Sequence, residues 1–298
     1  MMDWKRQEVG RHLKDFIVFT NIFVALGVTA LSIETLLLFG FFDAKYPALL
    51  FLLTLFIYTF HRVYRLNYRS PKEQLEGRHR WVRKNPKLAL GILIVSAVGI
   101  VCGLLAWSNL NTILCLIPIA CISLAYSIPC IKTSKGMMRL RDVKGLKIIV
   151  ISLVLGLTTV MLPLVFYNKL EASQPSELIL VFVRRLFFIF AITLPFDIRD
   201  IEYDRENNVK TIPTLLGIKW SIRLSICALV LFIFLAGLQA FAFHTLSFSS
   251  MLALSTSALV ALYLVIQVDK GKEELFYSLA VEGTMLLQLI LVLVSYSY

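Results

Sequence analysis

Long apolar runs that recur along the chain constrain its fold more than any other feature. Each run has about 20 residues with few charges, the length that an α-helix needs to cross the hydrocarbon core of a bilayer. Apolar residues make up 58% of the chain and charged residues 16%. A soluble domain usually has about 45–50% apolar residues and about 25% charged residues. The pattern therefore predicts an all-α bundle of about nine membrane-spanning helices. The predicted spans are Phe16–Gly40, Pro47–Leu66, Leu88–Trp107, Thr112–Ile131, Leu146–Tyr167, Leu178–Phe196, Ser221–Phe243, Phe248–Val268 and Phe276–Ser297.

The distribution of basic residues predicts the orientation of these spans. Of the 30 lysines and arginines, only Lys45 and Lys169 fall in loops on the side opposite the N-terminus, and Arg184 and Arg185 fall inside a span. Cytoplasmic loops of membrane proteins carry the excess of Lys and Arg. We therefore expect a multi-pass protein of the cytoplasmic membrane with its N-terminus in the cytoplasm. The net charge of +11 follows from this topology, and nothing in the sequence indicates nucleic-acid binding.

The chain is expected to form a single transmembrane domain over residues 1–298, because no polar stretch is long enough for a separate domain. The five cysteines lie in or at the ends of apolar segments without a Cys-x-x-Cys pair, so neither a zinc site nor a disulfide framework is supported. No obligatory protein partner is evident. The long, charged loops follow the second, fourth and sixth spans on the predicted cytoplasmic side, which is where we expect the functional site.

Three aspartates at the end of the sixth span are the strongest candidates for chemistry. Asp197, Asp200 and Asp204 are spaced i, i+3, i+7, which places all three carboxylates on one face of a helix. Converging carboxylates repel one another unless a cation lies among them, and Mg²⁺ typically binds through one or two carboxylates, waters and substrate phosphates. The alternative is a solvated helix whose acids pair with Arg199 and Arg205. Their position at the mouth of an apolar bundle favours the metal site.

The sequence around these aspartates resembles a known family. Asp197–Arg205 and the following Lys210–Gly217 are similar to the second aspartate-rich motif of the UbiA superfamily of intramembrane prenyltransferases. Leu124–Pro129 resembles the element after the fourth helix of that family, and the nine spans with long inner loops match as well. The resemblance implies a UbiA-like bundle that binds an isoprenyl diphosphate with Mg²⁺. It also implies transfer of the isoprenyl group to an aromatic or other lipid acceptor within the membrane.

The resemblance also implies a role for each matching position. Asp197, Asp200 and Asp204 would be the catalytic residues and would hold the metal. Tyr126 would line the cavity in which the diphosphate lies, and several basic side chains would face the diphosphate. These basic residues are Lys132, Arg139, Arg141 and Lys210.

The first aspartate-rich motif of the family, Asn-Asp-x-x-Asp-x-x-x-Asp at the inner end of the second span, is not matched in this sequence. Residues 44–72 contain no acid, and Tyr58, His61, Arg62 and Arg65 form an i, i+3, i+4, i+7 face there instead. One Mg²⁺ site is therefore better supported than two.

Two hypotheses remain open about this departure. In the first, which we favour, His61, Arg62 and Arg65 bind phosphate directly in place of one Mg²⁺ cluster, and the chain is an enzyme. In the second, the chain is a non-catalytic isoprenoid- or lipid-binding relative. Arg62 and Arg65 could also be ordinary anchors at the membrane surface. A secondary transporter is a weaker interpretation, because no pair of broken helices occurs in matched positions.

Charged and polar residues within the predicted spans require partners. Arg184 and Arg185 lie in the sixth span, and Glu34 and Glu282 are the candidate partners, in a structural ion pair rather than a substrate contact. Asn21 either points into the cavity or forms a hydrogen bond between helices.

Overall fold

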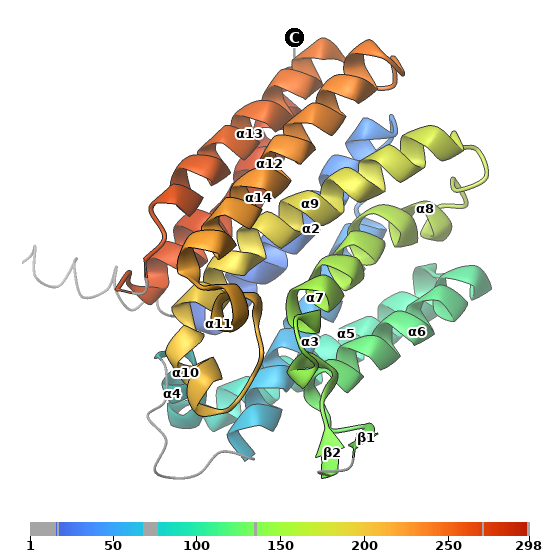
Figure 1. Ribbon diagram of the computed structural model, residues 1–298. Helices are drawn as coiled ribbons and strands as arrows, with labels where there is room; N and C mark the ends of the chain where they lie inside the picture. The colour runs from blue at the N-terminus through green and yellow to red at the C-terminus, as the bar shows by residue number, and fades with distance from the viewer. Residues whose placement is uncertain (1–15, 17, 68–76, 134–135, 270, 297–298) are drawn as a thin grey trace, which may run out of the picture.

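The computed structural model is an α-helical bundle (Figure 1). It describes residues 16, 18–67, 77–133, 136–269 and 271–296. Eight helices in this part of the chain are long and apolar enough to cross a membrane. Helices suit this environment because they satisfy all their backbone hydrogen bonds internally. The predicted all-α transmembrane bundle is confirmed. The eight spans are Lys45–Tyr64, Pro86–Trp107, Leu110–Ser127, Leu146–Phe166, Pro175–Arg199, Ile218–Phe241, Phe248–Ile266 and Phe276–Tyr296.

The remaining predicted span, Phe16–Gly40, corresponds to a shorter apolar helix, α2 (Ile22–Leu38), of 17 residues. At 1.5 Å per residue this helix is about 26 Å long, slightly less than the hydrocarbon core of a bilayer. Residues 1–15, which include the predicted basic N-terminal segment, lie outside the described residues. The structure therefore has eight full spans and one short apolar helix within the part of the chain that it describes.

The other helices of the bundle follow the predicted spans closely. They are α3 (Lys45–Asn67), α5 (Pro86–Trp107), α6 (Leu110–Ser127), α7 (Leu146–Gly156), α8 (Leu162–Phe166), α9 (Pro175–Arg199), α12 (Ile218–Phe241), α13 (Phe248–Ile266) and α14 (Gly283–Tyr296). Two π-helical turns, η2 (Leu157–Met161) and η3 (Phe276–Val281), interrupt the α-helical pattern without ending a span. In η2, the carbonyl of Thr158 accepts a hydrogen bond from the Tyr46 hydroxyl on α3, so α3 is tied to this turn.

Two groups of helices share α2. On one side, a buried apolar cluster joins α2 to α9, α12, α13 and α14. On the other side, a second cluster joins α2 to α3, α6 and α8. Large apolar side chains on α5 and α6, such as Val95, Leu105 and Leu114, are exposed, as expected for surfaces that face lipid.

The charged connections gather at one end of the bundle (Figure 1). They contain α4 (Gly77–Lys84), the antiparallel hairpin β1 (Ile131–Thr133) and β2 (Gly136–Met138), the 3-10 turn η1 (Leu140–Asp142), α10 (Ile201–Glu206) and α11 (Ile212–Leu216). We call residues 128–145 and 200–217 the loop end. The two segments are joined there by a hydrogen bond of 2.8 Å from the Gly145 N–H to the Lys210 carbonyl. The last turn of α14 lies at the opposite end of the bundle.

Candidate active site

An apolar cavity of about 480 Å³ lies between α3, α5, α6 and α7. Its walls are mostly aliphatic and aromatic, with Leu50 on α3, Ala97 on α5, Leu116 on α6 and Val154 on α7 among the lining residues. Ligand pockets commonly have volumes of about 300–1,000 Å³ and mainly apolar walls with a few polar groups. The cavity therefore has the size and lining of a binding site for an apolar group.

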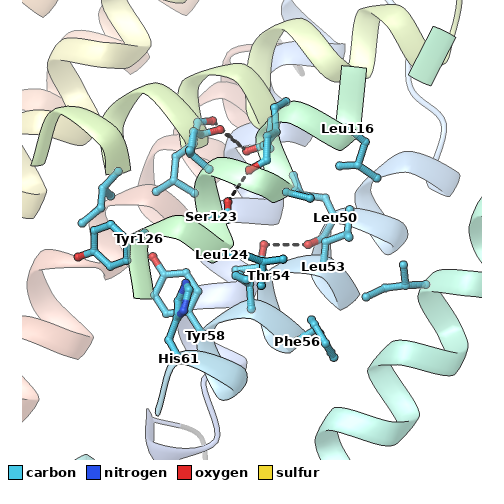
Figure 2. Close-up of a pocket in the computed structure, with 18 of the residues that line it drawn as sticks. Leu50, Leu53, Thr54, Phe56, Tyr58, His61, Leu116, Ser123, Leu124 and Tyr126 are labelled. Atoms are coloured by element: carbon cyan, nitrogen blue, oxygen red, sulfur yellow. Dashed lines mark hydrogen bonds between the residues drawn. The ribbon is translucent and has the colours of Figure 1, made fainter. Parts of the chain in front are cut away.

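Three polar side chains, Tyr58, His61 and Tyr126, lie together in the lining of this cavity (Figure 2). Tyr58 and His61 are one helical turn apart on α3, and both reach the cavity because residues at i and i+3 share a helix face. The His61 and Tyr126 ring centroids are 5.7 Å apart. His61 Nδ1 also forms a hydrogen bond with the hydroxyl of Ser127, which fixes α3 to the end of α6. The cavity therefore has a polar region near the loop end.

Arg141 of η1 extends this polar region. Its guanidinium carbon lies 5.4 Å from the centroid of the Tyr126 ring, within range of a cation–π interaction. Burial alone would lower its pKa, but Tyr126, Asp204 and Asp142 raise it above the usual value for arginine. Its buried Nε has no hydrogen-bond partner among the described residues. A buried donor without a partner costs about 1–3 kcal/mol, so Arg141 is suited to binding an anion.

A buried lysine lies beside two of the three predicted aspartates. Nζ of Lys147, in the first turn of α7, is 2.6 Å from Asp197 Oδ1 and 3.6 Å from Asp204 Oδ2. All three side chains are buried. A charged group is tolerated in such a place only when it is paired. In this cluster the positive charge of Lys147 offsets part of the negative charge of the two carboxylates.

Asp200 has a different partner. The helix is interrupted at this residue, because α9 ends at Arg199 and α10 begins at Ile201. The Arg199 guanidinium donates two hydrogen bonds to the Asp200 carboxylate, at 2.7 and 3.1 Å. Arg199 also lies over the rings of Phe196 and Tyr277, so aromatic side chains hold it beside Asp200.

The three aspartates therefore do not form the predicted three-carboxylate cluster. Within the described ranges, no group of three or more His, Cys, Asp or Glu side chains is placed to hold a metal ion. The prediction assumed an unbroken helix from Asp197 to Asp204. The cations weighed as partners of these acids were Arg199, which does pair with Asp200, and Arg205, but not Lys147. The interruption at Asp200 and the ammonium group of Lys147 account for the difference.

The residues that are present fit one Mg²⁺ ion. Asp197 Oδ2 is buried and has no hydrogen-bond partner in the described part of the chain. The carboxylate of Asp204 lies close by, beside the same Lys147 ammonium group. Two carboxylates with substrate phosphates and waters are a typical Mg²⁺ environment. The inner end of α3 contributes Tyr58 and His61 to the cavity and no carboxylate. Among the residues that the structure describes, α3 therefore offers no carboxylates for a second ion.

The structure separates the basic residues that were predicted to face a diphosphate. Arg141 lies at the polar region of the cavity, whereas Arg139 is held by Asp142 at 2.8 and 2.9 Å. Lys132 and Lys210 are exposed at the loop end. Of these four positions, Arg141 is the one that the structure places against a residue lining the cavity.

The structure places two residues of the predicted phosphate-binding face of α3 in different surroundings. His61 lines the cavity, but Arg62 Nη1 donates a hydrogen bond of 2.8 Å to the carbonyl of Phe19, before α2. Successive residues of a helix point about 100° apart, so neighbours on α3 face different surroundings. The side chain of Arg65 lies outside the described residues.

The sequence interpretation did not identify Lys147 as a site residue. It stands second in an apolar run, where a lysine usually marks the membrane surface. Its burial was the missing information, and that depends on the packing of α7 against α9. The only local signal was a charge just inside the start of a span.

Two predictions about polar groups inside the bundle are answered. Glu34 of α2 pairs with Arg185 at 3.0 Å and lies 3.8 Å from Arg184, so the structural ion pair is confirmed with Glu34 as partner. Asn21 donates a hydrogen bond of 3.1 Å to the Thr59 hydroxyl. The second of the two roles considered for Asn21, a hydrogen bond between segments, is the one found.

Together, the fold and the cavity define a multi-pass integral membrane protein with an apolar chamber next to a buried charged cluster. Residues 78–281 match the UbiA prenyltransferase family. The chain belongs to this family.

Comparison with solved structures shows the same fold. A UbiA homolog from Archaeoglobus fulgidus bound to GPP and Mg²⁺ aligns with a TM-score of 0.62 at 12% identity, over 96% of this chain and 100% of the other. The apo structure of a UbiA homolog from Aeropyrum pernix K1 aligns with a TM-score of 0.53 at 16% identity, over 95% and 96% of the two chains. Comparison with curated protein sequences gave no match.

Proposed function

We propose that the protein is an intramembrane prenyltransferase that transfers the isoprenyl group of a prenyl diphosphate to an aromatic or other lipophilic acceptor. Residues 1–298 would act as one domain with the site on the cytoplasmic side. The observation that carries the proposal is that the apolar cavity adjoins a charged cluster. Tyr126 lines the cavity, Arg141 lies over Tyr126, and Arg141 interacts electrostatically with the neighbouring Lys147–Asp197 pair. The Archaeoglobus homolog of the same fold was solved with GPP and Mg²⁺, which supports a ligand of this class.

The arrangement matches the two parts of a prenyl diphosphate. The isoprenyl chain would lie in the cavity between α3 and α5–α7, where burial of apolar surface contributes about 25 cal/mol per Å². The diphosphate would lie at the loop end, where the unpartnered Nε of Arg141 offers a hydrogen bond. Tyr58 and His61 would line the boundary between the two parts.

In the proposed reaction, the bond between isoprenyl C1 and the diphosphate oxygen breaks, and its electron pair leaves with the diphosphate. A new bond forms between C1 and the acceptor, which gives up a proton. Arg141 and Lys147 would place positive charge beside the leaving diphosphate. The apolar walls would exclude water from the allylic carbon. Asp197 and Asp204 would hold Mg²⁺, which when bound would supply further positive charge to the diphosphate oxygens.

Product formation tests this proposal. Purified protein in lipid nanodiscs would be incubated with Mg²⁺, radiolabelled prenyl diphosphates of several chain lengths and a membrane lipid extract. A new labelled lipid is expected from the wild type and from the exposed control variant Glu206→Gln, but not from Asp197→Asn. Labelled product at the same rate from Asp197→Asn would contradict the assignment of the site.

A non-catalytic isoprenoid-binding protein is the second candidate. It is favoured by the lack of acids in residues 44–72 and by the position of Lys147 between two carboxylates that a metal would use. Saturable binding of prenyl diphosphate without product from any extract would select this candidate.

A further inference from the structure

We infer that Lys147 is a built-in cation of the diphosphate site, which competes with a divalent metal ion for Asp197 and Asp204. The role toward diphosphate rests on the proposed function. The competition with metal rests on the arrangement of these three side chains alone.

The ammonium group lies where a shared cation would lie. Its nitrogen is 2.6 Å from one carboxylate and 3.6 Å from the other, and the three side chains come from α7, α9 and α10. The start of α7 is held in place by Gly145, whose positive φ of 69° suits glycine and whose N–H donates to the Lys210 carbonyl. The position of Lys147 is therefore set by the backbone of the loop end.

Electrostatic repulsion prevents the Lys147 ammonium group and a divalent metal ion from lying between Asp197 and Asp204 at the same time. A divalent ion that both carboxylates coordinate directly would share the space between them with the ammonium group, and two cations at such a distance repel strongly in a buried site. The metal can then bind only if Lys147 moves away. Its flexible four-carbon stem allows this movement, but the lysine needs a new anionic partner.

A bound diphosphate would provide that partner. If Lys147 turns from the carboxylates to a phosphate oxygen, it no longer competes with the metal for Asp197 and Asp204. Metal and diphosphate would then strengthen each other's binding, because coupling between two sites is reciprocal. Without diphosphate, the lysine keeps metal affinity low.

The test measures Mn²⁺ binding by electron paramagnetic resonance, with purified full-length protein in nanodiscs and no diphosphate. Lys147→Gln and Lys147→Met are expected to bind Mn²⁺ about tenfold more tightly than the wild type, or better, since a charge-assisted interaction with the carboxylates is removed. Lys147→Arg, which keeps the charge, is expected to bind as weakly as the wild type. Lys144→Gln is the matched control, because it removes an exposed charge three residues away.

Thermal unfolding provides a second measurement for variants that are weakly folded. Mn²⁺ should raise the unfolding midpoint of Lys147→Gln and Lys147→Met more than that of the wild type, because a ligand of the native state stabilises it. The inference is overturned if the Lys147 variants bind Mn²⁺ no more tightly than the wild type, or if Lys144→Gln gives the same gain. Tighter Mn²⁺ binding in a protein that forms no prenylated product would support the inference while the proposed function fails.

Discussion

At the scale of single residues, the local partner separates side chains that look equivalent in the sequence. Arg139 and Arg141 are two positions apart, yet Arg139 is held by Asp142 and Arg141 lies over Tyr126 with a buried Nε that has no partner among the described residues. A buried donor of this kind is available to a ligand. The two arginines are therefore expected to respond differently to mutation.

Replacement of Arg141 by glutamine is expected to weaken binding of a prenyl diphosphate by about tenfold or more, because a charge-assisted hydrogen bond contributes about 1.5–3 kcal/mol. Arg139→Gln is the matched control and should have a smaller effect. The measurement is calorimetric titration with a non-reactive thiolodiphosphate analogue. Equal losses in the two variants would show that Arg141 has no special contact with the ligand.

The aspartates provide a second comparison. Asp197 is buried beside Lys147, whereas Asp200 is held by Arg199. Asp197→Asn is expected to reduce Mn²⁺ affinity in the presence of the thiolodiphosphate analogue by about tenfold or more, and Asp200→Asn is expected to reduce it less. Glu206→Gln serves as an exposed control. A larger loss in Asp200→Asn than in Asp197→Asn would contradict the assignment of Asp197 as the main metal-binding carboxylate.

At the scale of helices, most of the bundle could be predicted from the sequence. A run of about 20 apolar residues has few alternatives to a membrane-spanning helix, so the spans from Lys45 onward agree closely with the predicted ones. The helix interruption at Asp200 could not be predicted, because no proline or glycine marks it. Which of His61 and Arg62 lines the cavity could not be predicted either, since this depends on which neighbours pack against α3.

The pairing of α2 with α9 through charged residues gives a prediction at this scale. Glu34→Gln leaves Arg184 and Arg185 without their shared buried carboxylate, and loss of one partner of a buried ion pair typically costs about 3–5 kcal/mol. We expect a clear fall in the thermal unfolding midpoint in detergent. Glu171→Gln, at an exposed position, is the control. An unchanged midpoint for Glu34→Gln would mean that this pair does not stabilise the bundle.

At the scale of the whole molecule, α7 connects the two parts of the site. Val154 lines the cavity, and Lys147, two turns earlier on the same helix, contacts Asp197 of α9. Because α7 packs against α9 and also lines the cavity, the apolar chamber and the charged cluster adjoin. This arrangement depends on contacts between distant parts of the chain, which the pattern of spans alone does not determine.

Filling the chamber is expected to exclude the isoprenyl chain without disturbing the charged cluster. Ala97→Phe places an aromatic ring in the cavity wall and should lower affinity for a long-chain prenyl diphosphate by about tenfold or more, an amount equal to burial of a few methylene groups. Binding of inorganic pyrophosphate should remain unchanged. Val98→Phe, at an exposed neighbouring position, is the control. Similar losses for both ligands would indicate a general disturbance of the fold.

The central claim is that the apolar cavity holds the isoprenyl chain of the substrate. The most direct test is to locate this chain in the protein. A prenyl diphosphate analogue with a photoreactive group at the end of its chain would be cross-linked to the wild type, and the labelled residues would be identified by mass spectrometry. We expect labels on cavity residues of α3, α5, α6 and α7, such as Leu50, Ala97 and Leu116, reduced by excess unlabelled prenyl diphosphate. Labels confined to α12, α13 and α14, or labels unaffected by the competitor, would contradict the assignment of the cavity as the isoprenyl site.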